Sequence, residues 1–256
     1  MGKTSQRALR MAKAVFAKRW WGYCQICESR TLFIALGSWY RDQLLCAKCR
    51  SIPRERALMR AITAYYPNWR NLVIHESSPG RRGASAKLAK EAGKYIATQY
   101  DPDVAPGALA RDGARSENLE AQTFADDSFD IVVTQDVFEH IFDPAAAIRE
   151  IMRTLKPGGA HIMSVPIVRK SDPSRRRAGL CDGKIVHYLP PQYHENPLDP
   201  GHGALVTVDW GYDIADYLTR HSGFPTTTLL IDDVAHGIQA EYLEIVMTRK
   251  SVSPAL

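Results

Sequence analysis

Three side chains that can accept or donate protons, Asp136, Glu139 and His140, closely follow a short apolar run, Ile131 to Val133. Such a run is typical of a strand buried on both faces, whose end presents polar side chains to a site. His140 is the first candidate for a general base because the ordinary pKa of an imidazole lies near neutrality. A histidine here can equally pack and hydrogen-bond the adjoining loop, and the sequence leaves both roles open.

A second group of histidines lies in an insertion over residues 167–209, with the members His187, His194 and His202. Two of them, His187 and His194, compete with His140 for the role of base. With Asp182 or Glu195, two of them could also hold a metal ion, although their spacing matches no tight ligand pattern. A basic run in the same insertion, Arg175 to Arg177, predicts either a solvated lid or attraction for an anionic acceptor.

Four of the five cysteines form two matched pairs, Cys24-x-x-Cys27 and Cys46-x-x-Cys49, separated by a segment long enough for a hairpin. Two such knuckles suit one tetrahedral zinc ion held by four thiolates. Four protein ligands leave the ion no open position, so the pattern predicts a structural zinc in a ribbon over residues 23–52. A redox dithiol is the alternative, and Cys181 is expected to be an ordinary thiol.

The elements that would position the first group have clear start and stop signals. Asp143-Pro144 places a capping residue before a proline at the first helical position, and apolar residues recur at helical spacing up to Lys156-Pro157-Gly158-Gly159. A second apolar strand, His161 to Val165, ends at Pro166. Strand, helix and strand predict one right-handed crossover of a parallel sheet.

This segment resembles class I S-adenosylmethionine-dependent methyltransferases of the type 11 kind. The strings FDIVVTQDVFEHIFDP and REIMRTLKPGGAHIMSVP look like the motifs of their fourth and fifth strands. The resemblance implies an α/β fold with a Rossmann-like seven-stranded sheet over residues 70–250, mostly parallel with the last strand antiparallel. The ribbon, HESSP and PPQYHENP together are also similar to bacterial methyltransferases encoded with surface-glycan genes.

The resemblance implies S-adenosyl-L-methionine as cofactor and transfer of its sulfonium methyl group to a nucleophile. Asp136, His140 and His194 would lie beside the methyl group as catalytic candidates. The expected cofactor-binding residues are Glu76, Ser78, Gly80, Gln99, Tyr100, Glu117, Asn118, Leu119 and Gln135. Glu76 keeps the carboxylate that would hold the cofactor's amino group, and Gln99 or a displaced Asp101 would meet the ribose.

The N-terminal segment, residues 1–22, has several basic residues and no acidic one. Apolar residues at helical spacing predict a basic amphipathic helix there, which would pack on the body, bind RNA or an anionic membrane surface, or serve as an organellar transit peptide. A linking helix is expected within residues 53–69. No apolar run is long enough to span a membrane and no signal core is visible, so a cytoplasmic protein is expected.

Three functions fit these observations. The first is methylation of a hydroxyl on a sugar, glycan or other small metabolite. The second is RNA methylation, with the ribbon and the basic N-terminus as the nucleic-acid grip. The third is a scaffold without chemistry, whose altered cofactor loops no longer bind S-adenosylmethionine. The sequence does not predict the oligomeric state.

Overall fold

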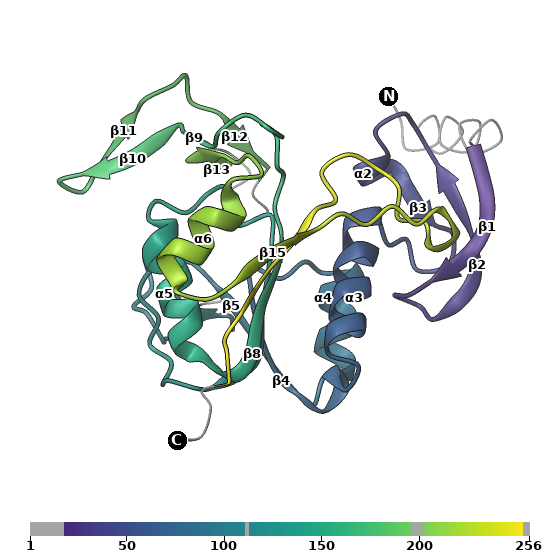
Figure 1. Cartoon of the computed structure of the whole chain (residues 1–256), viewed down its shortest axis with the longest axis horizontal. Helices are drawn as coiled ribbons and strands as arrows, with labels where there is room; N and C mark the ends of the chain where they lie inside the picture. The colour runs from purple at the N-terminus through teal and green to yellow at the C-terminus, as the bar shows by residue number, and fades with distance from the viewer. Residues whose placement is uncertain (1–17, 111–112, 196–200, 202, 253–256) are drawn as a thin grey trace.

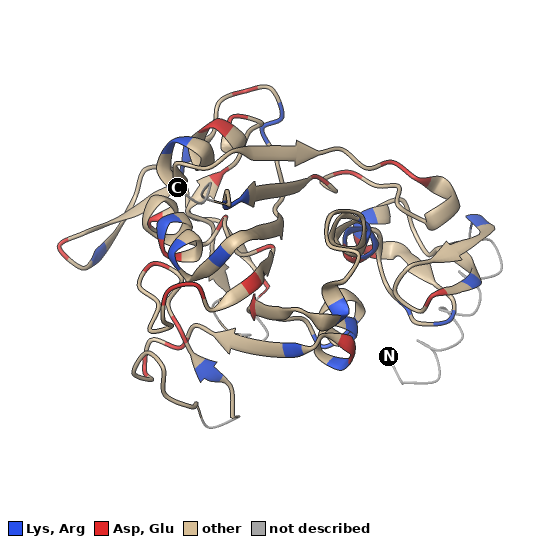
Figure 2. Cartoon of the chain, turned by 60° about the horizontal axis from the view of Figure 1, so that its bottom comes forward, with Lys and Arg blue, Asp and Glu red and all other residues tan. Residues whose placement is uncertain are grey.

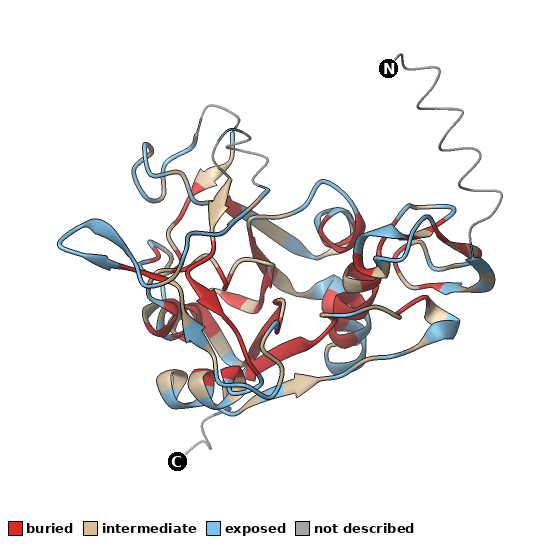
Figure 3. Ribbon diagram, turned by 90° about the horizontal axis from the view of Figure 1, so that it is seen from above, coloured by how far each residue is buried: buried red, intermediate tan, exposed pale blue. Residues whose placement is uncertain are grey.

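The computed structural model describes residues 18–110, 113–195, 201 and 203–252. Two parts are visible in Figure 1: a small N-terminal sheet, β1 to β3, and a larger layered domain, with helices α3 and α4 between them. Buried positions concentrate in the strands of the larger domain and in α3 (Figure 3). Lys and Arg are interspersed with Asp and Glu along the described chain (Figure 2).

The larger domain is built on a seven-stranded sheet with the order β15-β16-β8-β7-β4-β5-β6. Its strands are β4 (Val73–Ser77), β5 (Lys94–Gln99), β6 (Arg115–Ser116), β7 (Phe129–Gln135), β8 (Leu155–Ser164), β15 (Thr226–Leu229) and β16 (Ile245–Arg249). The pairs among β4 to β8 are parallel, whereas β16 runs antiparallel to both of its neighbours. This confirms the fold predicted from the sequence, including the antiparallel last strand.

Strand β7 is apolar because both of its faces are covered. Ile131 and Val133 pack into one core cluster together with side chains from α3 (Pro53–Tyr65) and α4 (Gly83–Glu91). Val132 points into a second cluster, with side chains from α5 (Pro144–Thr154) and α6 (Ile214–Ser222). The sheet therefore lies between two helical layers, as a continuous apolar strand requires.

Helix α5 begins and ends where the sequence predicts. The Asp143 side chain accepts hydrogen bonds from the backbone N–H groups of Ala145 and Ala146 at 3.1 and 3.0 Å, and Pro144 occupies the first turn. Strand β8 starts directly after the helix, at Leu155, and thus earlier than the predicted His161. The early start follows from pairing of Leu155 with Phe129, before a bulge in the ladder.

The N-terminal sheet consists of β1 (Lys18–Cys24), β2 (Ser29–Ala35) and β3 (Leu44–Cys46), with the short helix α2 (Tyr40–Gln43) between the last two strands. The predicted helix over residues 1–22 is wrong for residues 18–22, which lie in β1; residues 1–17 are outside the described part. Antiparallel pairing places Trp20 opposite Phe33, with ring centroids 6.2 Å apart. These cross-strand contacts override the helical spacing of the apolar residues.

A buried arginine joins the N-terminal sheet to the C-terminal part of the chain. Arg56 of α3 is fully buried and donates from Nη2 to the carbonyl oxygens of Leu44 at 3.0 Å and Gly237 at 2.7 Å. Gly237 follows the 3-10 turn η2 (Val234–His236), whose Val234 carbonyl accepts from the Trp20 indole at 2.8 Å. The segment between β15 and β16 therefore packs against the N-terminal sheet (Figure 1). A second 3-10 turn, η1 (Trp69–Asn71), precedes β4.

The insertion between β8 and α6 contains short paired strands. They are β9 (Arg175–Arg176), β10 (Ala178–Cys181), β11 (Lys184–His187), β12 (Tyr193–His194), β13 (Ala204–Leu205) and β14 (Val208–Asp209). The β10–β11 hairpin projects from the domain and is largely exposed (Figure 3). Between β13 and β14, the Thr207 N–H and hydroxyl donate to the Glu139 carbonyl oxygen at 2.7 and 3.1 Å. The insertion is thereby fixed to the turn after β7. Within the described part, no helix is long and apolar enough to cross a membrane.

Two histidines inside the sheet are buried in neutral form. The Nε2 atoms of His75 and His161 lie 2.8 and 3.0 Å from the hydroxyl oxygens of Thr98 and Thr134. Burial lowers the pKa of His75 to about 4 and that of His161 to about 3. In the unfolded chain each of the two imidazoles takes up a proton below its ordinary pKa of 6.5. In the folded chain both imidazoles stay neutral down to their lowered pKa values. Stability is therefore lost as the pH falls below that value.

We predict that His161→Gln weakens this acid sensitivity. The variant removes one protonating site from the unfolded state, so the pH slope of the unfolding free energy between about pH 5.5 and about pH 4.5 should fall by about 1.4 kcal/mol per pH unit. Urea unfolding of both proteins at the two pH values measures the slopes. An unchanged slope would show that His161 is protonated in the folded state.

Candidate active site

The sequence-predicted cofactor residues gather at one edge of the sheet. Because β4, β5, β6 and β7 are parallel, their carboxyl ends meet at that edge, at Glu76, Gln99, Glu117 and Gln135. Ligands of open α/β sheets bind outside these strand ends. The glycine-poor loop 78–82 lies here, between β4 and α4.

Glu76 lies at the centre of a buried hydrogen-bond network. Its Oε1 accepts from the Ser85 hydroxyl at 2.7 Å and from Nε2 of Gln135 at 2.7 Å. Its Oε2 accepts from the Tyr95 hydroxyl at 2.8 Å. Burial raises the pKa of Glu76, and the three donors act in the opposite direction. The structure thus brings Glu76 and Gln135 into direct contact and adds two further donors, Ser85 and Tyr95, which carry no motif that sequence reasoning could have used.

The loop after β4 is anchored at both ends. Ser78 has a left-handed backbone, with φ 56°, and its hydroxyl accepts from Nε2 of Gln99 at 3.3 Å. The Gly80 N–H donates to the Ser85 hydroxyl at 3.0 Å, and Gly80 itself is exposed. At Gly83, φ is 61°, and an added Cβ would lie 2.1 Å from the Glu55 carboxyl carbon. Glycine is therefore required at position 83, where α4 begins.

Residues 117–119, which are also predicted to bind the cofactor, are only partly available to a ligand. The buried Glu117 carboxylate accepts from Nε of Arg115 at 2.8 Å and from the Thr123 N–H at 3.0 Å. Asn118 Oδ1 accepts from the Glu120 N–H at 2.9 Å. By contrast, Tyr100 is 54% exposed, so its ring is free to contact a ligand. Asp101 Oδ1 accepts from the Asp103 N–H at 3.0 Å, inside its own turn.

Asp136 is held by two arginines from the N-terminal part. Its backbone is left-handed, with φ 53°, and its N–H donates to the Ser164 carbonyl oxygen at 2.9 Å. Oδ1 lies 2.8 Å from Nη2 of Arg41 in α2, and Oδ2 lies 3.3 Å from Nε of Arg54 in α3. Sequence reasoning missed both arginines because they are far from Asp136 along the chain. Their contacts bring the N-terminal part over the carboxyl end of β7.

Glu139, His140 and His194 form a compact group beside Asp136. The His140 and His194 rings are perpendicular, with centroids 5.0 Å apart. Burial, and then the nearby Asp136, raises the pKa of Glu139 to about 8, while burial lowers the pKa values of His140 and His194. The structure therefore unites His140 with its competitor His194.

The other predicted members of the histidine group lie elsewhere. His187 is exposed in β11, and His202 is outside the described residues. Among the described residues, His194 forms no ligand group with Asp182 or Glu195, and its acidic neighbour is Glu139 instead. The β12–β13 pairing determines this arrangement, which the local spacing of the sequence could not reveal.

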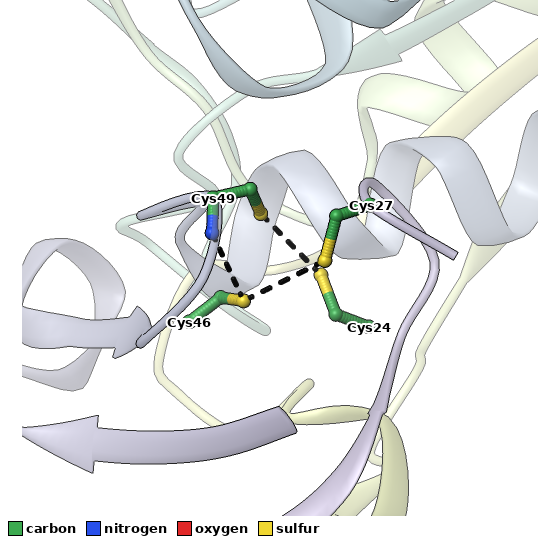
Figure 4. A group of neighbouring side chains, drawn as sticks. All are labelled: Cys24, Cys27, Cys46 and Cys49. Atoms are coloured by element: carbon green, nitrogen blue, oxygen red, sulfur yellow. Dashed lines mark hydrogen bonds between the residues drawn. The ribbon is translucent and has the colours of Figure 1, made fainter. Parts of the chain in front are cut away.

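The four paired cysteines converge as predicted (Figure 4). Their sulfur atoms all lie within 4.8 Å of one another, at 3.7 Å for Cys24 and Cys49 and 3.9 Å for Cys27 and Cys46. A tetrahedral zinc ion with bonds of about 2.3 Å sets its sulfur ligands about 3.8 Å apart. The Cys49 N–H also donates to the Cys46 sulfur at 3.4 Å. The donor set and its spacing fit a zinc ion held by these four residues, and Cys181 is exposed elsewhere.

An open cavity of about 480 Å³ lies next to this edge, between the N-terminal part and the segment before β16. Trp39 and Tyr40 line one side, and Tyr242 and Glu244 line the other. Lys170 also lines it and lies 3.1 Å from Glu244 Oε1. None of the sequence-predicted site residues contributes to its wall.

Comparison with known proteins gives matches that are described as methyltransferases. Residues 76–163 match the family model described as a methyltransferase domain. A probable S-adenosylmethionine-dependent methyltransferase of Mycolicibacterium smegmatis is 32% identical over 167 residues, which cover 64% of this chain and 60% of that protein. An uncharacterized methyltransferase of Mycobacterium sp. (strain JLS) is 28% identical over 43% of this chain and 44% of its own length. The chain thus matches less than two thirds of these relatives' length.

Two solved structures that are similar to this chain have low sequence identity. An S-adenosylmethionine-dependent methyltransferase from Mesorhizobium loti has 17% identity and a TM-score of 0.48, with 75% of this chain and 97% of that chain covered. A Burkholderia thailandensis 1,6-didemethyltoxoflavin N1-methyltransferase, solved with S-adenosylhomocysteine, has 17% identity and a TM-score of 0.49, with 77% and 78% covered.

We predict one zinc ion per chain at the cysteine cluster. Cys46→Ser should lose most of the zinc and lower the midpoint of thermal unfolding, because binding at a structural site is coupled to folding. Elemental analysis of the purified protein measures the zinc content. Cys181→Ser is the matched control and should keep both zinc and stability. Equal zinc content in Cys46→Ser and the unaltered protein would contradict the four-thiolate site.

Proposed function

We propose that this chain, which carries a methyltransferase domain, is an S-adenosylmethionine-dependent methyltransferase. The observation that carries the proposal is positional: the region that matches the methyltransferase family model, residues 76–163, includes the predicted cofactor residues at the ends of four parallel strands. A cofactor at this edge would lie beside Asp136 and the Glu139, His140 and His194 group. The proposal therefore joins cofactor and chemistry in one site.

In this proposal the cofactor extends along the edge from β7 to β6. The methionine part lies against the loop at Ser78 and Gly80, where the absence of a side chain at Gly80 leaves the backbone accessible. In this proposal Glu76 acts on the cofactor indirectly. Its buried carboxylate is already hydrogen-bonded to protein groups and orients Gln135 and Ser85 through those bonds.

The nucleoside part extends toward β5 and β6. Gln99 meets the ribose and the exposed Tyr100 ring contacts the adenine. Because the Glu117 carboxylate is occupied by Arg115 and Thr123, the segment 117–119 contributes its backbone, the Asn118 amide and Leu119.

The reaction would be an in-line displacement. The acceptor's lone pair forms the new bond to the methyl carbon, the sulfur–carbon bond breaks, and its electrons neutralise the sulfonium. A hydroxyl acceptor also loses a proton, which His140 or His194 receives in this proposal; the contact between their rings supports a shared role. Asp136, ion-paired with Arg41 and Arg54, acts in this proposal as a positioning residue rather than as the base.

The acceptor proposed is a hydroxyl of a small metabolite, with a sugar or glycan as the leading class. Two relatives are described as ubiquinone biosynthesis O-methyltransferases, from Ruegeria pomeroyi and Caulobacter vibrioides, with 32% and 33% identity over 81 and 67 residues. The basic run of the insertion does not favour an anionic acceptor, since Arg177 is paired with Asp209 at 2.7 Å and Arg176 donates to the Phe142 carbonyl oxygen at 2.8 Å. RNA is tested as the other acceptor class.

We predict that S-adenosylhomocysteine raises the midpoint of thermal unfolding. A ligand that binds only the folded state at 100 times its dissociation constant adds about 2.7 kcal/mol of stability. Gln99→Ala should need a higher ligand concentration for the same shift, whereas Gln192→Ala, an exposed glutamine of the insertion, should behave as the unaltered protein. No shift at saturating ligand would support a scaffold that does not bind the cofactor.

We predict that His140→Ala lowers kcat by about two to four orders of magnitude, the range for loss of acid–base catalysis, while cofactor affinity stays near normal. His194→Ala should mainly raise KM for the acceptor. Transfer of labelled methyl groups to hydroxyl-bearing metabolites and to RNA, at low and high salt, measures both variants and the acceptor class. His187→Ala, exposed in β11, is the matched control. Full activity of both variants would exclude this cluster from catalysis.

A further inference from the structure

We propose that Glu139, His140 and His194 form a second metal site, distinct from the cysteine cluster, which takes one divalent transition-metal ion. Two segments bring the three residues together: the turn after β7 holds Glu139 and His140, and β12 of the insertion holds His194. The binding itself is independent of the proposed function. The role assigned to the ion deepens that function and rests on it.

The geometry of the three side chains suits a shared ion. Nε2 of His140 and Nδ1 of His194 each lie 3.8 Å from Oε1 of Glu139, and one ligand atom from each residue lies within 4.8 Å of the others. Metal bonds of about 2.1 Å demand ligand separations of about 3.0 to 3.4 Å. Each histidine nitrogen therefore has to approach Oε1 of Glu139 by only about 0.4 to 0.8 Å, within the reach of side-chain rotation.

The Glu139 carboxylate supplies the second, independent observation. Its side chain is 2% exposed, and both of its oxygens are buried without a hydrogen-bond partner in the described structure. A buried polar group in this state is costly unless a partner compensates it. The nearest arginines, Arg41 and Arg54, are directed at Asp136 instead. A cation between Glu139 and the two imidazoles would supply the missing partner.

A hydrogen bond to the backbone holds the imidazole of His140 in the tautomer that can bind a metal through Nε2. Its Nδ1 lies 2.9 Å from the Leu205 carbonyl oxygen, which can only accept, so Nδ1 carries the proton and the Nε2 lone pair faces Glu139. Leu205 belongs to β13, which pairs with β12 and sets His194 opposite Ala204. Thr207 holds the Glu139 carbonyl oxygen from the same insertion. The turn after β7 and the insertion thus present their ligands to each other.

The donor set indicates the kind of ion. Two imidazoles and one carboxylate suit manganese, iron, cobalt or zinc better than calcium or magnesium, which prefer all-oxygen sites. Three protein ligands leave open positions, unlike the closed four-thiolate cluster. An open position facing the acceptor would bind its hydroxyl oxygen and lower the pKa of that hydroxyl. With the ion bound, the proton would leave to water, and the oxygen would form the bond to the methyl carbon as the sulfur–carbon bond breaks. His140 and His194 would then serve as ligands, in place of the proton-accepting role proposed above for the site without metal.

Manganese separates the two metal sites, because it favours nitrogen and oxygen over thiolate ligands. The full chain is first loaded with one equivalent of zinc, which the four thiolates hold in preference to the imidazole and carboxylate ligands, and free Mn²⁺ is then titrated and followed by its electron paramagnetic resonance signal. We expect one Mn²⁺ bound per chain, and binding weakened by more than about 100-fold in Glu139→Gln and in His140→Ala. His187→Ala, the exposed histidine of the same insertion, should bind Mn²⁺ as the unaltered protein does.

Thermal unfolding distinguishes loss of Mn²⁺ binding from misfolding of the variant. Glu139→Gln keeps the shape of the side chain and replaces a buried carboxyl group, so it should fold at least as well as the unaltered chain without Mn²⁺, but Mn²⁺ should no longer raise its unfolding midpoint. Absence of Mn²⁺ binding to the zinc-loaded chain would overturn the proposal. So would binding that Glu139→Gln and His140→Ala leave unchanged. Neither outcome depends on cofactor or acceptor, so failure of the metal site and failure of the proposed function remain distinguishable.

Discussion

The contact between Asp136 and the two arginines Arg41 and Arg54 is the constraint on which the arrangement of the site depends. Asp136 directly follows the central strand β7, and the arginines come from α2 and α3, which adjoin the cysteine cluster. Both arginine side chains are mostly shielded, so loss of either partner would leave a poorly solvated charge. The N-terminal part is thereby fixed over the carboxyl edge of the sheet.

The cysteine cluster is connected to the same edge by a second route. Arg50, directly after Cys49, accepts a hydrogen bond through its carbonyl oxygen from Arg82 at 2.9 Å, at the end of the loop proposed to hold the cofactor. Glu55 caps α3 by accepting from the Ile52 N–H at 2.9 Å and lies against Gly83. Because metal binding couples to folding, zinc at the cluster would fix the residues of both connections: the arginines that hold Asp136, and the residues that contact Arg82 and Gly83. A metal remote from the chemistry can in this way organise the site.

The parts of the fold and of the site that could be predicted from the sequence are those specified by local signals. The buried strand β7, the capped helix α5 and the cysteine knuckles are specified by neighbouring residues, and the structure has all three. The strand at residues 18–22 was missed because its pairing with β2 competes with an equally good helical spacing. The Arg41–Asp136 pair and the meeting of His140 with His194 join distant segments, and no local pattern encodes them.

The central claim is that S-adenosylmethionine binds at the carboxyl edge that the N-terminal part covers. Amide hydrogen exchange with and without saturating S-adenosylhomocysteine tests it most directly. The account predicts slower exchange in residues 78–80, 99–101 and 117–119, with no change in the exposed β10–β11 hairpin. Unchanged exchange in all three segments, or protection confined to the cavity wall at residues 239–244, would contradict it.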